Sequence, residues 1–242
     1  MTYQAVFKRY EVKYMLTRQQ KNLLLEAMLP YMRLDDYGLT TIRNIYFDTE
    51  NYRLVRRSIE KPIYKEKLRI RSYKKADAQD KVFVELKKKY DSVVYKRREA
   101  LEQAKTLEWL ESKEHFPLET QIGREIDYFF DYYKTLTPKV FLSYEREAFY
   151  SLDGSDFRIT FDENILARQE KLSLSEDIWG TELIDKGNVL MEIKCSGGMP
   201  MWLVKALTDN KIYSTSFSKY GTAYQKIICG SQDAADILRK TG

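Results

Sequence analysis

An alternation of charged and apolar residues between Lys65 and Arg98 constrains this chain more than any other feature. The stretch reads KEKLRIRSYKKADAQDKVFVELKKKYDSVVYKRR and carries thirteen Lys and Arg residues against five Asp and Glu. Successive side chains of a β-strand point to opposite faces, so its first half places four cations in one row. These are Lys65, Lys67, Arg69 and Arg71. The alternation returns after a polar turn, from Val82 to Lys87. We therefore predict a β-hairpin with one apolar and one charged face.

The row of four cations needs an anion near it. Unit charges about 4 Å apart repel each other by about 1 kcal/mol in water and by about 4 kcal/mol at an effective dielectric near 20. On an open strand face, salt and water would screen this repulsion, and the row would be an ordinary solvated surface. In a concave and partly desolvated site, the same row would bind a highly charged anion. The strict period of two, and its recurrence elsewhere in the chain, favour the second interpretation.

Composition excludes several classes of protein. Of the 242 residues, 14% are aromatic and 32% are charged, which suits a sheet with one charged face and does not suit disorder. We expect one domain, residues 1–242, and a cytoplasmic, reduced protein, because no signal peptide or membrane-spanning run is visible and Cys195 and Cys229 have no metal-ligand spacing. His115 is the only histidine, which argues against histidine metal sites and histidine-relay catalysis. Any chemistry must therefore use carboxylates, lysine, arginine and a metal.

Charged strand faces recur along the chain. The clearest examples lie in residues 7–16 (FKRYEVKYML), 139–151 (KVFLSYEREAFYS), 156–164 (DFRITFDEN) and 188–195 (NVLMEIKC). A shorter strand is expected around 43–47, and a third basic strand follows the hairpin at SVVYKRREA. Helical spacing predicts helices from Thr17 to near Pro30, over 99–113, between Pro117 and Pro138, over 200–209, and from Ser216 onward.

These elements predict an α+β fold of about eight strands. An open sheet of this pattern would expose its basic face, whereas a closed barrel would turn that face inward. A small barrel normally fills its lumen with apolar side chains, so a lumen of Lys, Arg and Glu implies a wet channel that holds a charged ligand. The helices would then cover the outside of the barrel.

Short motifs of charged and aromatic residues follow one another along the chain: R-x-E-x-K at 9–13, YFDT at 46–49, K-x-R-x-R at 67–71, VELK at 84–87, Lys96, R-x-A-F at 146–149, R-x-T-x-D at 158–162, MEIK at 191–194 and SKY at 218–220. Each motif is weak alone, but their order and spacing together are specific. In these motifs the chain resembles the polyphosphate-polymerase (VTC) domain of the triphosphate tunnel metalloenzyme, or CYTH-like, superfamily. The resemblance covers nearly the whole chain. It implies an α+β fold in which an eight-stranded antiparallel β-barrel tunnel, with helices packed outside, binds tripolyphosphate or a longer chain.

The resemblance also implies roles for individual residues. The catalytic cations would be Lys13, Arg69, Arg71, Lys87, Arg146 and Arg158. Further phosphate contacts would come from Arg9, Arg43, Lys67, Lys96, Lys194, Ser218 and Lys219. A divalent metal, manganese or magnesium, would bind mainly to Glu192, with Glu11 and Glu85 as secondary ligands. Each of these carboxylates has an alternative role as a counter-ion for its basic neighbours.

The implied activity is transfer of the γ-phosphoryl group of ATP to a growing inorganic polyphosphate. The hydrolase branch of the superfamily carries Glu at two positions before the first-strand Lys, and Arg9 stands at the first of them here. This substitution favours the polymerase branch. An inorganic tripolyphosphatase or nucleoside triphosphatase, and a non-catalytic polyphosphate-binding subunit, are the alternatives. The expected partners are ATP and polyphosphate, with no nucleic acid. Family analogy adds an integral-membrane partner that would hold the chain at the inner face of a membrane.

Overall fold

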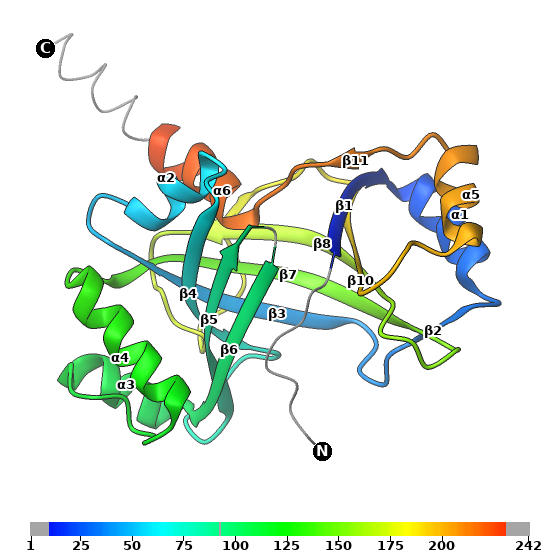
Figure 1. Cartoon of the computed structure of the whole chain (residues 1–242). Coiled ribbons are helices and arrows are strands. Elements are labelled where there is room, and N and C mark those ends of the chain that lie inside the picture. The colour runs from blue at the N-terminus through cyan, green and yellow to red at the C-terminus, as the bar shows by residue number, and fades with distance from the viewer. Residues whose placement is uncertain (1–9, 92, 231–242) are drawn as a thin grey trace, which may run out of the picture.

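One large antiparallel sheet organises the computed structural model, which describes residues 10–91 and 93–230 (Figure 1). Its strands follow the spatial order β11-β1-β10-β8-β7-β3-β4-β5-β6, with β2 added to β7 and β9 added to β8. The eight long strands are β1 (Tyr10–Thr17), β3 (Thr40–Asp48), β4 (Tyr64–Ser72), β5 (Lys81–Tyr90), β6 (Val93–Glu102), β7 (Thr137–Ser151), β8 (Arg158–Arg168) and β10 (Asn188–Cys195). The short ones are β2 (Met32–Leu34), β9 (Thr181–Glu182) and β11 (Ser214–Thr215). The sequence predicted all eight long strands, although it gave β3 only as a shorter strand around 43–47.

The expected closed barrel is wrong. Within the described residues β6 pairs only with β5, and β1 pairs with β10 and β11, so the sheet is open and contains eleven strands. The sheet is nevertheless strongly curled. Glu11 of β1 lies 3.3 Å from the Nζ atom of Lys87 on β5, although five strands separate these two along the sheet. Side chains therefore span the concave face where backbone pairing does not close it.

Helices cover the convex face of the sheet in two groups (Figure 1). The helices α1 (Arg18–Met28) and α5 (Met201–Asp209) pack on β1, β8 and β10, for example through Leu24 and Leu203 against Ile159 and Met191. The helices α3 (Gln103–Ser112) and α4 (Gln121–Tyr133) pack on the apolar face of β3 to β6. Burying these apolar faces leaves most of the charged strand residues for the concave face, which also holds a third apolar cluster around Ile42, Leu142 and Tyr220.

Two local predictions need correction. Residues 99–102 continue β6 and do not begin the helix predicted over 99–113, because they pair with Lys81–Val84 of β5 and α3 begins only at Gln103. The helix α2 (Arg53–Ile59) was not predicted at all. By contrast, α1 begins as predicted: the Thr17 hydroxyl accepts from the Gln20 N–H, and the Gln20 side chain accepts from the Thr17 N–H.

Asp48 explains where α2 begins. It is fully buried and accepts backbone N–H bonds from Thr49, Leu54 and Val55 at 2.8, 2.8 and 3.0 Å. Its Oδ2 also accepts from the hydroxyl of Tyr220 at 3.0 Å. One carboxylate thus caps α2 and ties it to α6 (Lys219–Ala223), which continues into a π-helix (Tyr224–Cys229).

In the described part of the chain, no helix has both the length and the apolar character needed to cross a membrane.

Candidate phosphate-binding face

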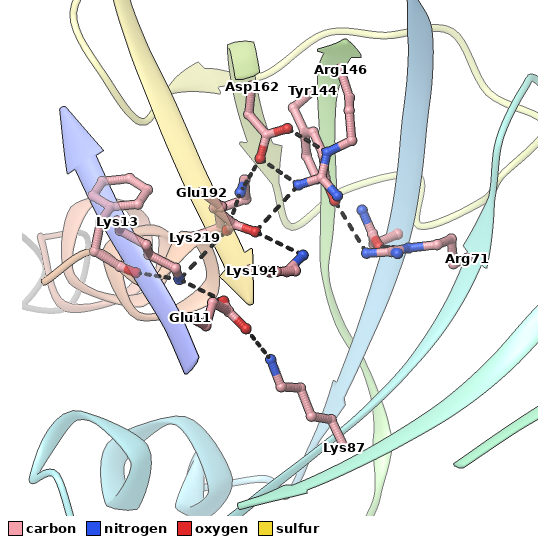
Figure 2. A network of polar contacts seen from close by, with 12 residues as sticks. Glu11, Lys13, Arg71, Lys87, Tyr144, Arg146, Asp162, Glu192, Lys194 and Lys219 are labelled. Carbon is pink, nitrogen blue, oxygen red and sulfur yellow. Dashed lines mark hydrogen bonds and ion pairs between the residues drawn. The ribbon is translucent and has the colours of Figure 1, made fainter. Parts of the chain in front are cut away.

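The concave face of the sheet brings most of the predicted site residues together (Figure 2). Alternation along each strand turns them to this side. The gathered residues are Glu11, Lys13, Lys67, Arg69, Arg71, Glu85, Lys87, Lys96, Arg146, Glu192 and Lys194 on the strands, with Ser218 and Lys219 at the start of α6. We call this set, together with Asp162 and Arg98, the charged interior.

Glu192 lies at the centre of one half of the charged interior. Four cations surround its carboxylate at 3.2 to 3.6 Å: Lys13, Arg146, Lys194 and Lys219. The residue is only 6% exposed. Burial alone would raise the pKa of Glu192, but these cations hold it well below its usual value. The carboxylate is therefore ionised at neutral pH.

Asp162 fixes two of those cations. Its two carboxylate oxygens accept hydrogen bonds from the Nε and Nη2 atoms of Arg146, at 2.5 and 2.6 Å. The ammonium of Lys219 lies 2.5 Å from Oδ2 of Asp162. Asp162 is fully buried. A bidentate pair of this kind orients the guanidinium, so Asp162 sets the direction in which Arg146 presents its remaining donor.

Glu85 holds the other half of the charged interior. It is 1% exposed and lies within 3.8 Å of four cations: Arg69 at 2.6 Å, Lys96 at 2.8 Å, Arg98 at 3.1 Å and Arg71 at 3.8 Å. Burial would raise the pKa of Glu85, but the arginines and Lys96 hold it well below its usual value. Its surroundings favour the counter-ion role for Glu85 over the role of metal ligand.

Glu11 connects the two halves. Its oxygens lie 3.6 Å from Lys13 and 3.3 Å from Lys87. Although burial opposes the shift, Lys87 and the other nearby lysines lower the pKa of Glu11 to about 2. The same Lys13 lies 3.6 Å from Glu192, so two carboxylates face one ammonium group.

The start of α6 supplies fixed polar groups to the same space. The Ser218 hydroxyl accepts from the Gly221 N–H at 3.2 Å and from the ammonium of Lys67 at 3.1 Å. The carbonyl of Phe217 accepts from Lys13 at 2.8 Å. The SKY segment therefore places its serine and lysine against the strands that carry the cations.

Lys67 is the least compensated cation of the set. Burial, Lys87 and Lys13 together lower its pKa to about 7. Within the described residues no carboxylate lies within 4.0 Å of its Nζ atom. The ammonium form of Lys67 is therefore disfavoured in this structure, and a bound anion would stabilise it.

Sequence reasoning missed the polar residues that hold the arginines. Arg71 donates to the Asn44 side chain at 2.9 Å and to the Tyr144 hydroxyl at 3.1 Å. Arg69 donates to the Tyr46 hydroxyl at 2.9 Å. Tyr46 and Tyr144 alternate in register with other interior positions, so strand period could have suggested them, but only the fold shows which arginine each one contacts.

One predicted site residue, Arg43, lies on the other side of the sheet, and another, Arg158, lies at the edge of the charged interior. Arg43 is on the opposite face of β3, in step with Ile45 and Phe47 of the outer core, and burial lowers its pKa despite the charge of Asp177. Arg158 lies at the end of the interior row beside Lys194, its guanidinium 4.6 Å from the ring centre of Tyr150. Its buried Nε has no hydrogen-bond partner in the described structure. Arg9 is outside the described residues.

A divalent metal fits one part of this face. No three His, Cys, Asp or Glu side chains of the described residues gather as a ready-made cage. Asp162 and Glu85 already hold cations at 2.5 to 2.8 Å, whereas the ion pairs of Glu11 and Glu192 are longer, at 3.2 to 3.6 Å. Magnesium and similar hard cations often bind through one or two carboxylates together with substrate phosphates. The donor set fits a metal of that kind on Glu192 and Glu11.

The fold and the charged interior together define a class of protein in which an antiparallel sheet curls around a cation-rich concave face. The chain belongs to the VTC domain family, whose model matches residues 8–228, and this confirms the family resemblance of its motifs. No curated protein matches the chain.

Solved structures share the fold. A candidate adenylate cyclase from Bacillus halodurans superposes with a TM-score of 0.55 at 16% identity, covering 89% of this chain and 96% of its own. A candidate adenylyl cyclase from Hippeastrum, described as having a dominant triphosphatase activity, gives a TM-score of 0.51 at 16% identity and covers 89% and 94%. At this identity the likeness establishes the α+β fold with its large antiparallel sheet.

Proposed function

We propose that this chain is a polyphosphate polymerase, which transfers the γ-phosphoryl group of ATP to the end of an inorganic polyphosphate and releases ADP. The observation that carries the proposal is the excess of cations over carboxylates on the concave face. Within the described residues, the charged interior contains ten of these cations: Lys13, Lys67, Arg69, Arg71, Lys87, Lys96, Arg98, Arg146, Lys194 and Lys219. Four carboxylates oppose them: Glu11, Glu85, Asp162 and Glu192. A phosphate chain supplies the missing negative charge, and membership of the VTC family supports a substrate of this kind.

The aromatic residues of the interior favour a phosphate chain over nucleic acid. Tyr46 and Tyr144 are 6% and 3% exposed, and their hydroxyls accept hydrogen bonds from arginines. Tyr46 is also stacked on Tyr220, with ring centres 4.7 Å apart. Binding of single-stranded nucleic acid relies on aromatic faces that are free to stack on bases. These two rings are already occupied by protein neighbours.

Phosphoryl transfer needs little covalent chemistry from a protein. A terminal oxygen of the acceptor chain forms a bond to the γ-phosphorus of ATP, and the bond from that phosphorus to the bridging oxygen breaks, leaving its electron pair on ADP. Arg69 and Arg146 would hold phosphate oxygens in fixed directions because Glu85 and Asp162 orient their guanidinium groups. Lys13, Lys87 and Lys219 would add point charges that neutralise the transferring group.

A bound divalent metal would supply further neutralisation of the phosphate oxygens, and Glu192 with Glu11 would hold it. The positions of the lysines and arginines then keep donor and acceptor in line and limit the access of water.

Hydrolysis of a triphosphate is the second candidate. The triphosphatase activity described for the Hippeastrum protein of the same fold favours it. Water would then replace the chain end as acceptor, with the same cations around the phosphates. Arg9, at a position where the hydrolase branch has a carboxylate, supports transfer to a chain instead.

A product assay separates these reactions. Purified protein is incubated with ATP and manganese, chain length is followed on a gel, and free phosphate is measured alongside. We expect long chains and little free phosphate. Free phosphate without chains would overturn the polymerase proposal in favour of hydrolysis, and neither product, with polyphosphate binding retained, would indicate a non-catalytic binding subunit.

The metal ligand is tested in the same assay with Glu192→Gln, which keeps the shape of the side chain and removes its charge. Chain synthesis should fall at least 100-fold, roughly the loss of one strong transition-state contact. Glu108→Gln, on the exposed side of α3, is the matched control and should retain full activity. Retention of activity by Glu192→Gln would contradict its assignment.

A further inference from the structure

The cations on the concave face of the β4 and β5 hairpin have carboxylate partners at one end of the hairpin and none among the described residues at the other. At one end, Arg69 and Arg71 share the carboxylate of Glu85. At the other end, Lys65 and Lys67 point to the same concave face by strand alternation, and within the described residues no carboxylate lies within 4.0 Å of either ammonium. Positive charge without a counter-ion therefore increases toward the turn between β5 and β6.

Lys89 strengthens this gradient. It lies directly opposite Lys65 in the β4 and β5 pairing, and like charges in that position destabilise a sheet. Burial, Lys89, Lys13, Lys87 and Lys61 together lower the pKa of Lys65. Lys61 is exposed just before β4 and adds a further cation at this edge of the concave face, which we call the rim. Within the described residues no carboxylate forms an ion pair with Lys61, Lys65 or Lys89, so this group of lysines is suited to an anion from outside the protein.

Strand geometry places the rim beyond the central site, by which we mean the part of the charged interior around Lys67, Arg69 and Arg71. Lys65 is two residues from Lys67, which is about 7 Å along the strand. A short phosphate chain held by Arg69, Arg71 and Lys67 would end before it. A longer chain that continues in the direction of uncompensated charge would reach it.

We propose that Lys61, Lys65 and Lys89 form a rim subsite for the distal phosphates of a long polyphosphate, so that the chain leaves the charged interior past the turn between β5 and β6. This inference rests on the proposed function, because it assigns a direction to the same substrate. It adds a contact that serves long chains and not the reacting phosphates.

The test compares two ligands and two double variants by equilibrium binding. The ligands are tripolyphosphate and a size-fractionated long polyphosphate. Lys65→Gln with Lys89→Gln removes two rim charges. The control, Lys88→Gln with Lys186→Gln, removes two charges from outside the concave face, where Lys88 pairs with Glu125 and Lys186 with Glu182. Thermal unfolding of each variant verifies that the fold is kept.

We expect the rim variant to lose about tenfold in affinity for long polyphosphate, the loss of two ammonium contacts with phosphate, and to keep its affinity for tripolyphosphate within about twofold. The control should match the wild type with both ligands. Equal affinities of the rim and control variants for the long chain would overturn the subsite while leaving the proposed function intact. An equal loss for both ligands would also overturn it, by placing these lysines in the central site. Failure of the wild type to bind either ligand would overturn the proposed function and the subsite together.

Discussion

Lys67 of β4 and Lys87 of β5 lie directly opposite each other across the sheet, and Lys96 of β6 extends the same row. Like charges that face each other across strands destabilise a sheet. Glu11 offsets part of the repulsion, because its carboxylate lies 3.3 Å from Lys87. Among the described residues, the ammonium of Lys67 bonds only to the Ser218 hydroxyl. The sheet keeps this row despite the repulsion, which supports the proposal that a polyanion binds there.

Binding of tripolyphosphate should be coupled to uptake of protons. In the protein without bound phosphate, the pKa of Lys67 is about 7. A bound phosphate would raise this pKa by favouring the ammonium form. At pH 8 the free lysine is mostly neutral, so binding should take up as much as about one proton from this residue, and affinity should fall as pH rises further. Calorimetry in two buffers of different ionisation enthalpy measures the uptake. Lys67→Gln should reduce it; identical uptake in the variant would contradict the assignment.

Glu85→Gln should destabilise the protein and make it depend on an anion. The substitution leaves the buried or half-buried Arg69, Arg71 and Arg98, and the more exposed Lys96, without their shared carboxylate. We expect it to lower the free energy of unfolding by about 3 kcal/mol. Tripolyphosphate should then raise the melting temperature of the variant more than that of the wild type. Glu102→Gln, at an exposed position, is the control. An equal effect of tripolyphosphate on variant and wild type would argue against a shared anion site.

Arg69→Lys should separate charge from geometry. Arg69 contacts Glu85 through its Nε and Nη2 atoms and donates to the Tyr46 hydroxyl through Nη1. A lysine cannot reproduce this set of directed contacts. We expect turnover to fall by about 10 to 100-fold with little change in stability. Arg97→Lys makes the same replacement where the arginine faces Glu125 outside the interior, and it should retain activity. Similar rates for the two variants would indicate that charge alone suffices.

Arg43→Met and Arg71→Met test which face of the sheet binds phosphate. These arginines occupy adjacent strands and are similarly buried, at 7% and 6% exposed. Arg71→Met should weaken tripolyphosphate binding by about tenfold or more, because it removes a charge from the concave face. Arg43→Met should leave binding within about twofold of the wild type. Comparable losses in a direct binding assay would place phosphate contacts on both faces.

Strong patterns in the sequence allowed much of the fold to be predicted. Lys67, Arg69 and Arg71 alternate with Leu68 and Ile70, so their common face follows from the period of a strand. The stretch around Arg43 reads TTIRNIYF and mixes polar and apolar residues on both faces. Its period could not assign Arg43 to a side, and the structure places it with the outer core.

Local spacing also failed where a partner strand decided the outcome. Residues 99–102 fit a helical pattern, but pairing with β5 satisfies their backbone groups as strand. The helix α2 depends on Asp48, whose role as a cap requires it to be buried beneath Tyr220, 172 residues later in the chain. Neither effect is visible in a window of neighbouring residues.

By itself, the sequence determined that the family is VTC, and it determined which side chains share a strand face wherever charged and apolar residues alternate strictly, because both follow from residue type, order and spacing. Tertiary structure alone decided that the sheet stays open, that Glu85 collects four cations while Glu192 and Glu11 keep longer contacts, and that Asp162 orients Arg146. Those outcomes depend on distances between segments far apart in the chain. Such distances follow from the curl of the whole sheet, which no short pattern of residues encodes.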